Sequence, residues 1–165
     1  MRIYDGNNIR NIALLGESGA GKSNMTSALE FTAKITNKIP NSSDNVKISS
    51  SLALHAIEYQ SFKFNFFDVP GYVDFFGELE SGLAACDGAI ITVDGTADLS
   101  VGTETALELT DSRNIPRFIF VNKIDSEKAD YEKILLQLRK KYGKRIAPFH
   151  VPWGVAANFK GHINV

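Results

Sequence analysis

The most constraining feature of this chain is a glycine-rich octapeptide, GESGAGKS, at residues 16–23. It matches the pattern G-x-x-x-x-G-K-[ST] and follows a short apolar run, residues 12–15, that predicts a buried strand. Residues 23–36 then have the pattern of a helix. A strand, a glycine-rich turn and a helix in this order present backbone N–H groups to phosphate. The octapeptide therefore predicts a phosphate-binding loop.

The residue types in this loop have distinct roles in phosphate binding. We expect Lys22 to bridge the β- and γ-phosphates and the Ser23 hydroxyl to ligate Mg²⁺. The nucleotide-binding residues predicted here are Glu17, Ser18, Gly19, Ala20, Gly21, Lys22, Ser23 and Asn24. A glycine-rich turn that binds nothing is the structural alternative, and the strand and helix on either side disfavour it.

Short apolar runs alternate with amphipathic stretches along the whole chain. The pattern predicts strands at residues 12–15, 62–67, 89–93 and 118–121, and helices at 23–36, 72–86, 101–113 and 130–142, the last with Ser126 as its N-cap. Most of the strand runs are continuously apolar, which is typical of strands buried on both faces. We expect an α/β P-loop NTPase fold, a mostly parallel sheet with helices on both faces. Alternation within residues 62–67 indicates antiparallel pairing with residues 55–59.

A D-x-x-G string, Asp68-Val69-Pro70-Gly71, ends the strand at residues 62–67. Ligands bind at the carboxyl ends of strands in open α/β sheets. We therefore expect Asp68 to hold Mg²⁺ through a water and the Gly71 N–H to meet the γ-phosphate. A simple type I or II turn with Pro70 at its second position is the alternative.

A second polar motif, Asn122-Lys123-Ile124-Asp125, follows the strand at residues 118–121. The Asp125 carboxylate can accept hydrogen bonds from N1–H and the exocyclic amine of guanine, a pair of donors that adenine lacks. Asn122 can reach N7 of the base and bridge to the phosphate loop, and the Lys123 stem can lie over the base. A charged turn is the structural alternative. The three motifs together predict one site for GTP or GDP with Mg²⁺.

With these motifs, the sequence resembles the G domain of elongation factor G, and most closely its elongation-factor-G-like paralogues, from about Asn8 onward. Residues 68–75 (DVPGYVDF) resemble D-T-P-G-H-V-D-F, and residues 121–125 (VNKID) resemble V-N-K-M-D. The resemblance implies a translation factor that binds and hydrolyses GTP and acts on the ribosome in the cytoplasm. The alternatives are a GTP sensor with little hydrolysis, a tetracycline ribosomal-protection protein, and an ATPase, against which Asp125 argues.

Departures from the family pattern include Tyr72 and Ser49. Tyr72 stands where the family has the histidine that positions the attacking water. The resemblance thus implies a catalytic set of Tyr72, Lys22 and Gly71, with slow hydrolysis. Counting back from Asp68 places Ser49 at the family's Mg²⁺-binding threonine. Ser49 lies in an aperiodic stretch, residues 37–51, which is interpreted either as a solvated loop or as a loop that orders on a ligand.

The residues near the end of the chain indicate how the domain is organised. Residues 148–154 (PFHVPWG), followed by Phe159-Lys160-Gly161, resemble the family segment where an extra subdomain begins within the G domain. No fifth guanine-binding motif with its strand and closing helix follows Asp125. We expect residues 1–165 to form an incomplete G domain, truncated before its last strand and helix, with an inserted subdomain starting at about 146–165.

Composition bears on the remaining function classes. Lys and Arg number 18 against 19 Asp and Glu, a net charge of −1, so the chain is no polycation and we expect no DNA partner. One cysteine, Cys86, excludes a disulfide scaffold, and we expect it to be a small core residue. No apolar stretch approaches the roughly 18–20 residues of a membrane span, so no membrane partner is expected. His55, His150 and His162 lack metal-ligand spacing and are expected to be structural.

Overall fold

A computed structural model describes residues 3–38, 52–70 and 76–165 of the chain. Its elements in chain order are η1 (Gly6–Asn8), β1 (Ile9–Leu15), α1 (Lys22–Thr32), β2 (Ala53–Tyr59), β3 (Phe62–Asp68), α2 (Phe76–Ala84), β4 (Gly88–Asp94), α3 (Val101–Ser112), β5 (Arg117–Asn122), α4 (Tyr131–Tyr142), η3 (Gly143–Arg145), β6 (His150–Trp153), η4 (Ala156–Asn158) and β7 (Gly161–Asn164). All four predicted strands are present.

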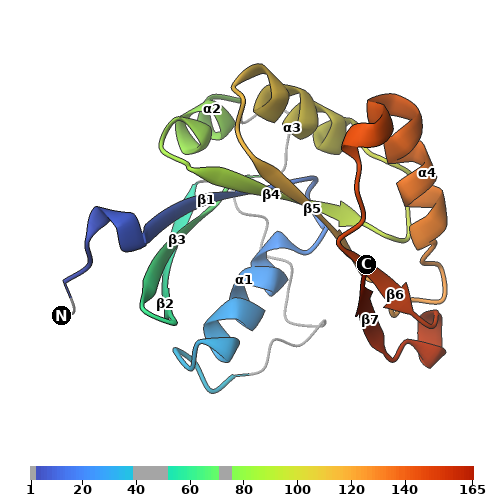
Figure 1. Cartoon of the computed structure of the whole chain (residues 1–165), viewed down its shortest axis with the longest axis horizontal. Helices are drawn as coiled ribbons and strands as arrows, with labels where there is room; N and C mark the ends of the chain where they lie inside the picture. Colours follow the sequence, from blue (N-terminus) through green and yellow to red (C-terminus); the bar gives the residue numbers. More distant parts are fainter. Residues whose placement is uncertain (1–2, 39–51, 71–75) are drawn as a thin grey trace.

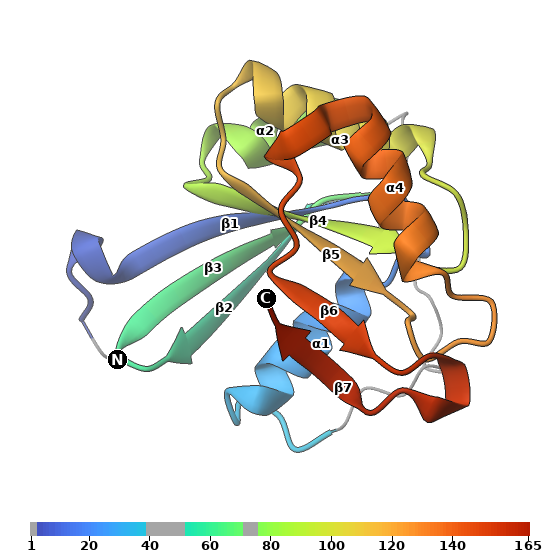
Figure 2. The ribbon, with the colours of Figure 1, turned by 45° about the vertical axis from the view of Figure 1, so that its right-hand side comes forward.

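The main sheet has the strand order β2-β3-β1-β4-β5. Strand β1 runs parallel to both β3 and β4, β4 runs parallel to β5, and β2 is antiparallel to β3. The mostly parallel sheet and the one antiparallel pair are therefore confirmed. Strands β6 and β7 form a separate antiparallel hairpin, which lies beside the β5 end of the sheet (Figure 2).

Helices cover both faces of this sheet, as the alternating pattern predicts (Figure 1). Leu14 and Phe66 point to one face, where Met25 and Leu29 of α1 pack on them. The opposite face buries alternate strand residues, Ala13, Leu15, Ile91 and Val93, against Leu83 of α2, Leu107 of α3 and Ile134 of α4. Both faces of the central strands are thus apolar and covered, which is why their sequences are continuous apolar runs.

The helix boundaries differ from the sequence prediction at several ends, including that of α2, which ends at Ala84 rather than at residue 86. Helix α1 ends at Thr32 rather than at residue 36, because Lys34 takes a left-handed backbone conformation with φ of 60°. The N-cap of α4 is Asp130, whose side chain accepts from the backbone N–H of Lys133. The prediction of Ser126 as the cap is wrong, because Ser126 belongs to a separate turn in which its N–H donates to the Lys123 carbonyl.

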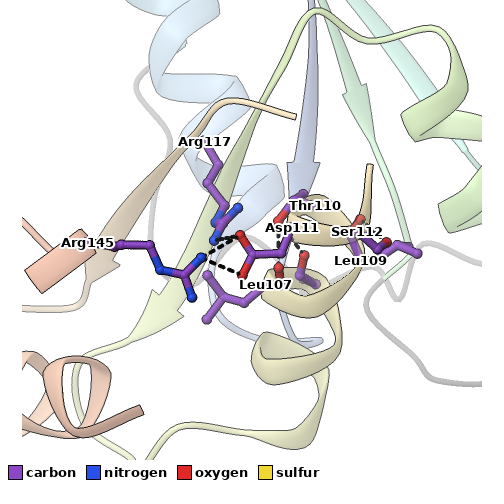
Figure 3. Close-up of polar contacts among 8 residues, drawn as sticks. Leu107, Leu109, Thr110, Asp111, Ser112, Arg117 and Arg145 are labelled. Carbon is purple, nitrogen blue, oxygen red and sulfur yellow. Dashed lines mark hydrogen bonds and ion pairs between the residues drawn. The ribbon is translucent and has the colours of Figure 1, made fainter. Parts of the chain in front are cut away.

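At the end of the sheet opposite the phosphate loop, two arginines contact the carboxylate of Asp111 on α3 (Figure 3). Arg117, the first residue of β5, donates to Asp111 Oδ1 at 2.7 Å, and Arg145 of η3 approaches both carboxylate oxygens at 3.4 Å. The hydrogen bond from Arg117 is the main reason that the pKa of Asp111 lies below its usual value. This cluster joins α3, β5 and η3.

At the edge of the described sheet, β5 carries two outward-facing aromatic residues. Phe118 is 67% exposed and Phe120 is 44% exposed, although both belong to an otherwise covered α/β sheet. Among the described aromatic residues, the Phe118 ring contacts Phe149 alone, in a T-shaped arrangement with 6.4 Å between centroids. The expected domain organisation, an incomplete G domain with an inserted subdomain that starts at about 146–165, stays a prediction.

No helix within residues 3–38, 52–70 and 76–165 is long and apolar enough to cross a membrane.

Cys86 lies where the sequence places it, half-buried against the core that α2, α3 and α4 share. Its Sγ donates to the Gly82 carbonyl at 2.9 Å, and burial is the main cause that raises its pKa to about 11. The imidazole of His55 contacts Glu30 of α1 at 2.9 Å. His150 and His162 lie on the hairpin, with ring centroids 4.6 Å apart.

Candidate nucleotide-binding site

The three sequence motifs lie at the carboxyl ends of parallel strands, at one edge of the sheet. Strands β1 and β3 end in register, with Leu14 beside Asp68. Strand β5 ends beside β4, with Asn122 next to Asp94. Because β1 lies between β3 and β4, the phosphate loop that follows β1 stands between the other two motifs. The strand order thus assembles one site from three distant segments.

The phosphate loop depends on glycine at two of its positions. Gly16 has φ of +123°, and a Cβ there would lie 2.2 Å from the Thr92 carbonyl oxygen. Gly21 has φ of +98°, and a Cβ there would lie 2.1 Å from Nδ2 of Asn122. Both contacts are far inside van der Waals distance, so any side chain would push the loop away from the strand ends.

Lys22 is buried in the loop, with 7% of its surface exposed. Its Nζ donates to the carbonyl oxygens of Gly16 at 2.8 Å and Glu17 at 3.1 Å. Burial lowers the pKa of Lys22, while the charges of Asp68 and Glu17 oppose that shift. The ammonium group thus lies inside the ring of backbone atoms, where phosphate oxygens can replace the two carbonyls as its acceptors.

Ser23 and Asp68 meet beside the loop, as the predicted Mg²⁺ site requires. The Ser23 hydroxyl donates to Asp68 Oδ2 at 2.9 Å. Asp68 is 2% exposed, and its other oxygen, Oδ1, has no hydrogen-bond partner among the described residues. A buried carboxylate oxygen without a donor is costly unless a cation or water satisfies it. The pair therefore fits a hard cation such as Mg²⁺, which prefers oxygen ligands.

The second polar motif, Asn122-Lys123-Ile124-Asp125, is called the base-reading motif from here on, and it contacts the phosphate loop directly. Asn122 Nδ2 donates to the Ala20 carbonyl at 2.9 Å, although the two residues are 102 positions apart in the chain. This is the bridge that the sequence predicts for Asn122. Asp125 is exposed, and no hydrogen bond from the described residues reaches its carboxylate. Its oxygens are thus available to a guanine edge.

Lys123 has a partner that the sequence motifs do not reveal. Its backbone is left-handed, with φ of 59°, and its ammonium pairs with the carboxylate of Asp94, the last residue of β4. Asp94 ends an apolar strand, at the same carboxyl end of the sheet as the three motifs. That position was the one feature of the sequence that could have marked Asp94 as a site residue.

The remaining predicted residues divide into two groups. In the phosphate loop, Glu17 and Gly19 are exposed and Ser18 is half-buried, and Asn24 is exposed on α1. Gly71, Tyr72 and Ser49, the predicted catalytic and switch residues, lie outside the described residues. The structure thus brings together the phosphate loop, Asp68, Asn122 and Lys123. Contact of any of them with a nucleotide stays a prediction.

Comparison with known proteins agrees with this arrangement. The family model described as "Elongation factor Tu GTP binding domain" matches residues 7–161. Mitochondrial ribosome-releasing factor 2 of Culex quinquefasciatus is 33% identical over 88% of this chain and 21% of its own length. Elongation factor G-like protein of Thermotoga maritima is 27% identical over 96% of this chain and 24% of its own length. Elongation factor G of Dehalococcoides mccartyi is 28% identical over 99% of this chain and 25% of its own length.

A solved structure from another organism has a similar fold. The crystal structure of a protein from Thermus thermophilus superposes with a TM-score of 0.84 at 27% identity, over 96% of this chain and 26% of the other.

The fold and the three strand-end motifs define a P-loop guanine-nucleotide-binding domain. The chain belongs to the elongation factor Tu GTP binding domain family, and two of its listed relatives are named elongation factor G and elongation factor G-like protein. It spans about a quarter of the length of these relatives.

Proposed function

We propose that this chain binds GTP and GDP together with Mg²⁺ and hydrolyses GTP slowly. The observation that carries the proposal is the hydrogen bond from Asn122 to the Ala20 carbonyl, because it couples the base-reading motif to the phosphate loop. A site that held only phosphate would have no need of this coupling.

Each group in the site has a role in this proposal. Lys22 exchanges its carbonyl acceptors for phosphate oxygens, and the backbone N–H groups at the start of α1 donate to the same anion. Asp125 reads guanine through its two adjacent donors. Ser23 and Asp68 hold Mg²⁺, which neutralises charge on the β- and γ-phosphates when it is bound.

Hydrolysis depends on the position that Tyr72 occupies. A phenol offers its hydroxyl at a different reach from the ring nitrogen of a neutral imidazole, so Tyr72 aligns the attacking water less well than histidine. Most catalysis of phosphoryl transfer comes from positioning and charge stabilisation. Hydrolysis therefore survives at a low rate. Tyr72 also favours the second candidate function, a GTP-binding sensor with very little hydrolysis.

The ribosome is the partner that we propose for the intact protein. Relatives named ribosome-releasing factor 2 and elongation factor G support this assignment. In this proposal the segments at 37–51 and 68–75 change conformation with the nucleotide state, as switch segments do in GTPases. We propose a cytoplasmic setting, which the bacterial relatives favour over the mitochondrial one.

Competition binding tests nucleotide choice. A fluorescent GDP analogue is titrated into the 165-residue chain and displaced by GDP, GTP, ADP or ATP, each with Mg²⁺ or with EDTA. We expect displacement by GDP and GTP at concentrations at least about 100-fold lower than by ADP and ATP, because adenine loses both Asp125 bonds. Equal displacement by adenine and guanine nucleotides would contradict the proposal. Single-turnover hydrolysis with and without ribosomes then separates a slow GTPase from a sensor.

A further inference from the structure

Asp94 stands beside the base-reading motif but belongs to none of the three sequence motifs. It is the last residue of β4, and its carboxylate has three donors. The backbone N–H of Thr96 donates to Oδ1 at 2.9 Å, the Thr96 hydroxyl donates to the same oxygen at 2.6 Å, and the Lys123 ammonium donates to Oδ2. The carboxylate is therefore fixed in direction, with one oxygen dedicated to Lys123.

The backbone around this pair is fixed as well. The N–H of Gly95 donates to the Asn122 carbonyl at 2.9 Å, and the N–H of Asp130 donates to the Gly95 carbonyl at 2.9 Å. A Cβ on Gly95 would lie 2.7 Å from the Asn122 carbonyl oxygen. The loop after β4 and the base-reading loop after β5 thus form one packed unit.

Electrostatics favour a persistent ion pair at this position. The Asp94 side chain is 24% exposed and that of Lys123 is 40% exposed, so solvent screens the pair only in part. Burial opposes ionisation of Asp94, but the hydrogen bonds from Lys123 and Thr96 outweigh it and hold the pKa of Asp94 below its usual value. The carboxylate is charged throughout the neutral range.

We propose that Asp94 is a positioning residue for nucleotide binding, which holds the Lys123 side chain in the place where its stem covers the guanine ring. A free lysine side chain has many rotamers and must lose them when a base docks beneath it. Lys123 tethered at its ammonium has already lost most of them, so the base binds to a preformed cover. This inference rests on the proposed guanine-nucleotide function.

A role of Asp94 at the face of the base can be separated from a role at its edge. Asp94 acts through the face of the base, whereas Asp125 reads its edge. Inosine diphosphate has the same ring system as GDP but lacks the 2-amino group that Asp125 contacts. Loss of Asp94 should therefore weaken binding of both nucleotides by the same factor and leave their affinity ratio unchanged.

The test is a double-mutant cycle with displacement titrations by GDP and by inosine diphosphate. Asp94→Asn removes the carboxylate charge, and Lys123→Met breaks the same pair from the other side while keeping an unbranched stem. We expect each variant to weaken both nucleotides by about fivefold, and the double variant to bind no more weakly than Lys123→Met alone. Asp98→Asn is the matched control, because Asp98 also pairs with a lysine, Lys133, and should leave affinity unchanged.

The outcomes separate this inference from the proposed function. Wild-type chain that does not bind GDP defeats the proposed function, and the inference with it. Wild-type chain that binds GDP, with additive effects in the cycle or no effect of Lys123→Met, overturns the inference alone. A change in the GDP-to-inosine diphosphate ratio for Asp94→Asn also overturns it, because Asp94 would then act through the edge contact or the loop as a whole. If Asp94→Asn does not fold, Asp94→Ser takes its place in the same cycle and is judged by the same two readouts.

Discussion

Asn122 Nδ2 donates to the Ala20 carbonyl at 2.9 Å and occupies the space that a Cβ on Gly21 would need. The carboxyl end of β5 therefore sets both the shape of the phosphate loop and the residue allowed there. The phosphate loop and the base-reading motif are joined by this one contact.

Gly21→Ala should disrupt the phosphate loop. The substituted residue must either keep a left-handed φ or displace Asn122, and either change costs about 1–3 kcal/mol of the free energy of unfolding. We expect nucleotide binding to fall below detection in the same titration. Gly6→Ala is the control, because a Cβ at Gly6 meets nothing within 4 Å, and urea unfolding measures both variants. A Gly21→Ala chain with wild-type stability and affinity would refute the steric account.

Asp125→Asn should change the base that the site prefers. The substitution replaces an acceptor with a donor opposite the 2-position, which suits the carbonyl of xanthine rather than the amine of guanine. We expect GDP affinity to fall about 100-fold and xanthosine diphosphate affinity to rise. Calorimetry measures both, with Glu127→Gln, an exposed neighbour, as the control. Unchanged GDP affinity in Asp125→Asn would exclude the base-reading role.

Tyr72→His should increase the hydrolysis rate, because an imidazole nitrogen can orient the attacking water. We expect single-turnover GTP hydrolysis to rise by about tenfold, with GTP affinity unchanged. Tyr72→Phe tests whether the native hydroxyl contributes and should hydrolyse more slowly than wild type. If all three side chains give the same rate, the position does not take part in the reaction.

Asp111→Ala should lower stability at neutral pH by about 1 kcal/mol, since the carboxylate is partly exposed and solvent screens its arginine partners. The folded state holds the pKa of Asp111 below its unfolded value, so the unfolded chain binds the proton first. The stabilisation is therefore present above about pH 4 and is lost as the pH falls through the folded pKa. Urea unfolding at several pH values measures it. If wild type stays more stable than Asp111→Ala by the same free energy of unfolding down to strongly acidic pH, the ion pairs of Asp111 are not the source of the difference.

Cys86 should react slowly with alkylating agents in the folded chain. With a pKa of about 11, roughly 0.1% of the thiol is ionised at pH 8, against roughly a quarter for an unperturbed cysteine. We expect iodoacetamide to label the native chain at least about 100-fold more slowly than the urea-unfolded chain. Mass spectrometry gives an unambiguous count, because the sequence has a single cysteine. Equal rates in the two states would show that burial does not control this thiol.

The sequence alone predicted the features that depend on neighbouring residues. The phosphate loop, the strand runs and their alternation with helices follow from local turn chemistry and periodicity. Local signals were weaker at helix ends, where capping residues compete. Ser126 and Asp130 are both good caps, and only the turn that engages Ser126 with Lys123 leaves Asp130 to begin α4.

The tertiary structure decided which distant residues meet. The motif predicts that Asn122 reaches the phosphate loop, but it does not name Ala20 as the acceptor, and nothing in the sequence pattern pairs Asp94 with Lys123. Both contacts follow from the strand order β3-β1-β4-β5. Strand order is set by how the helices pack on the two faces of the sheet, which is a property of the whole chain. The sequence by itself therefore determined the chemical groups of the site, and the packing of the sheet determined their partners.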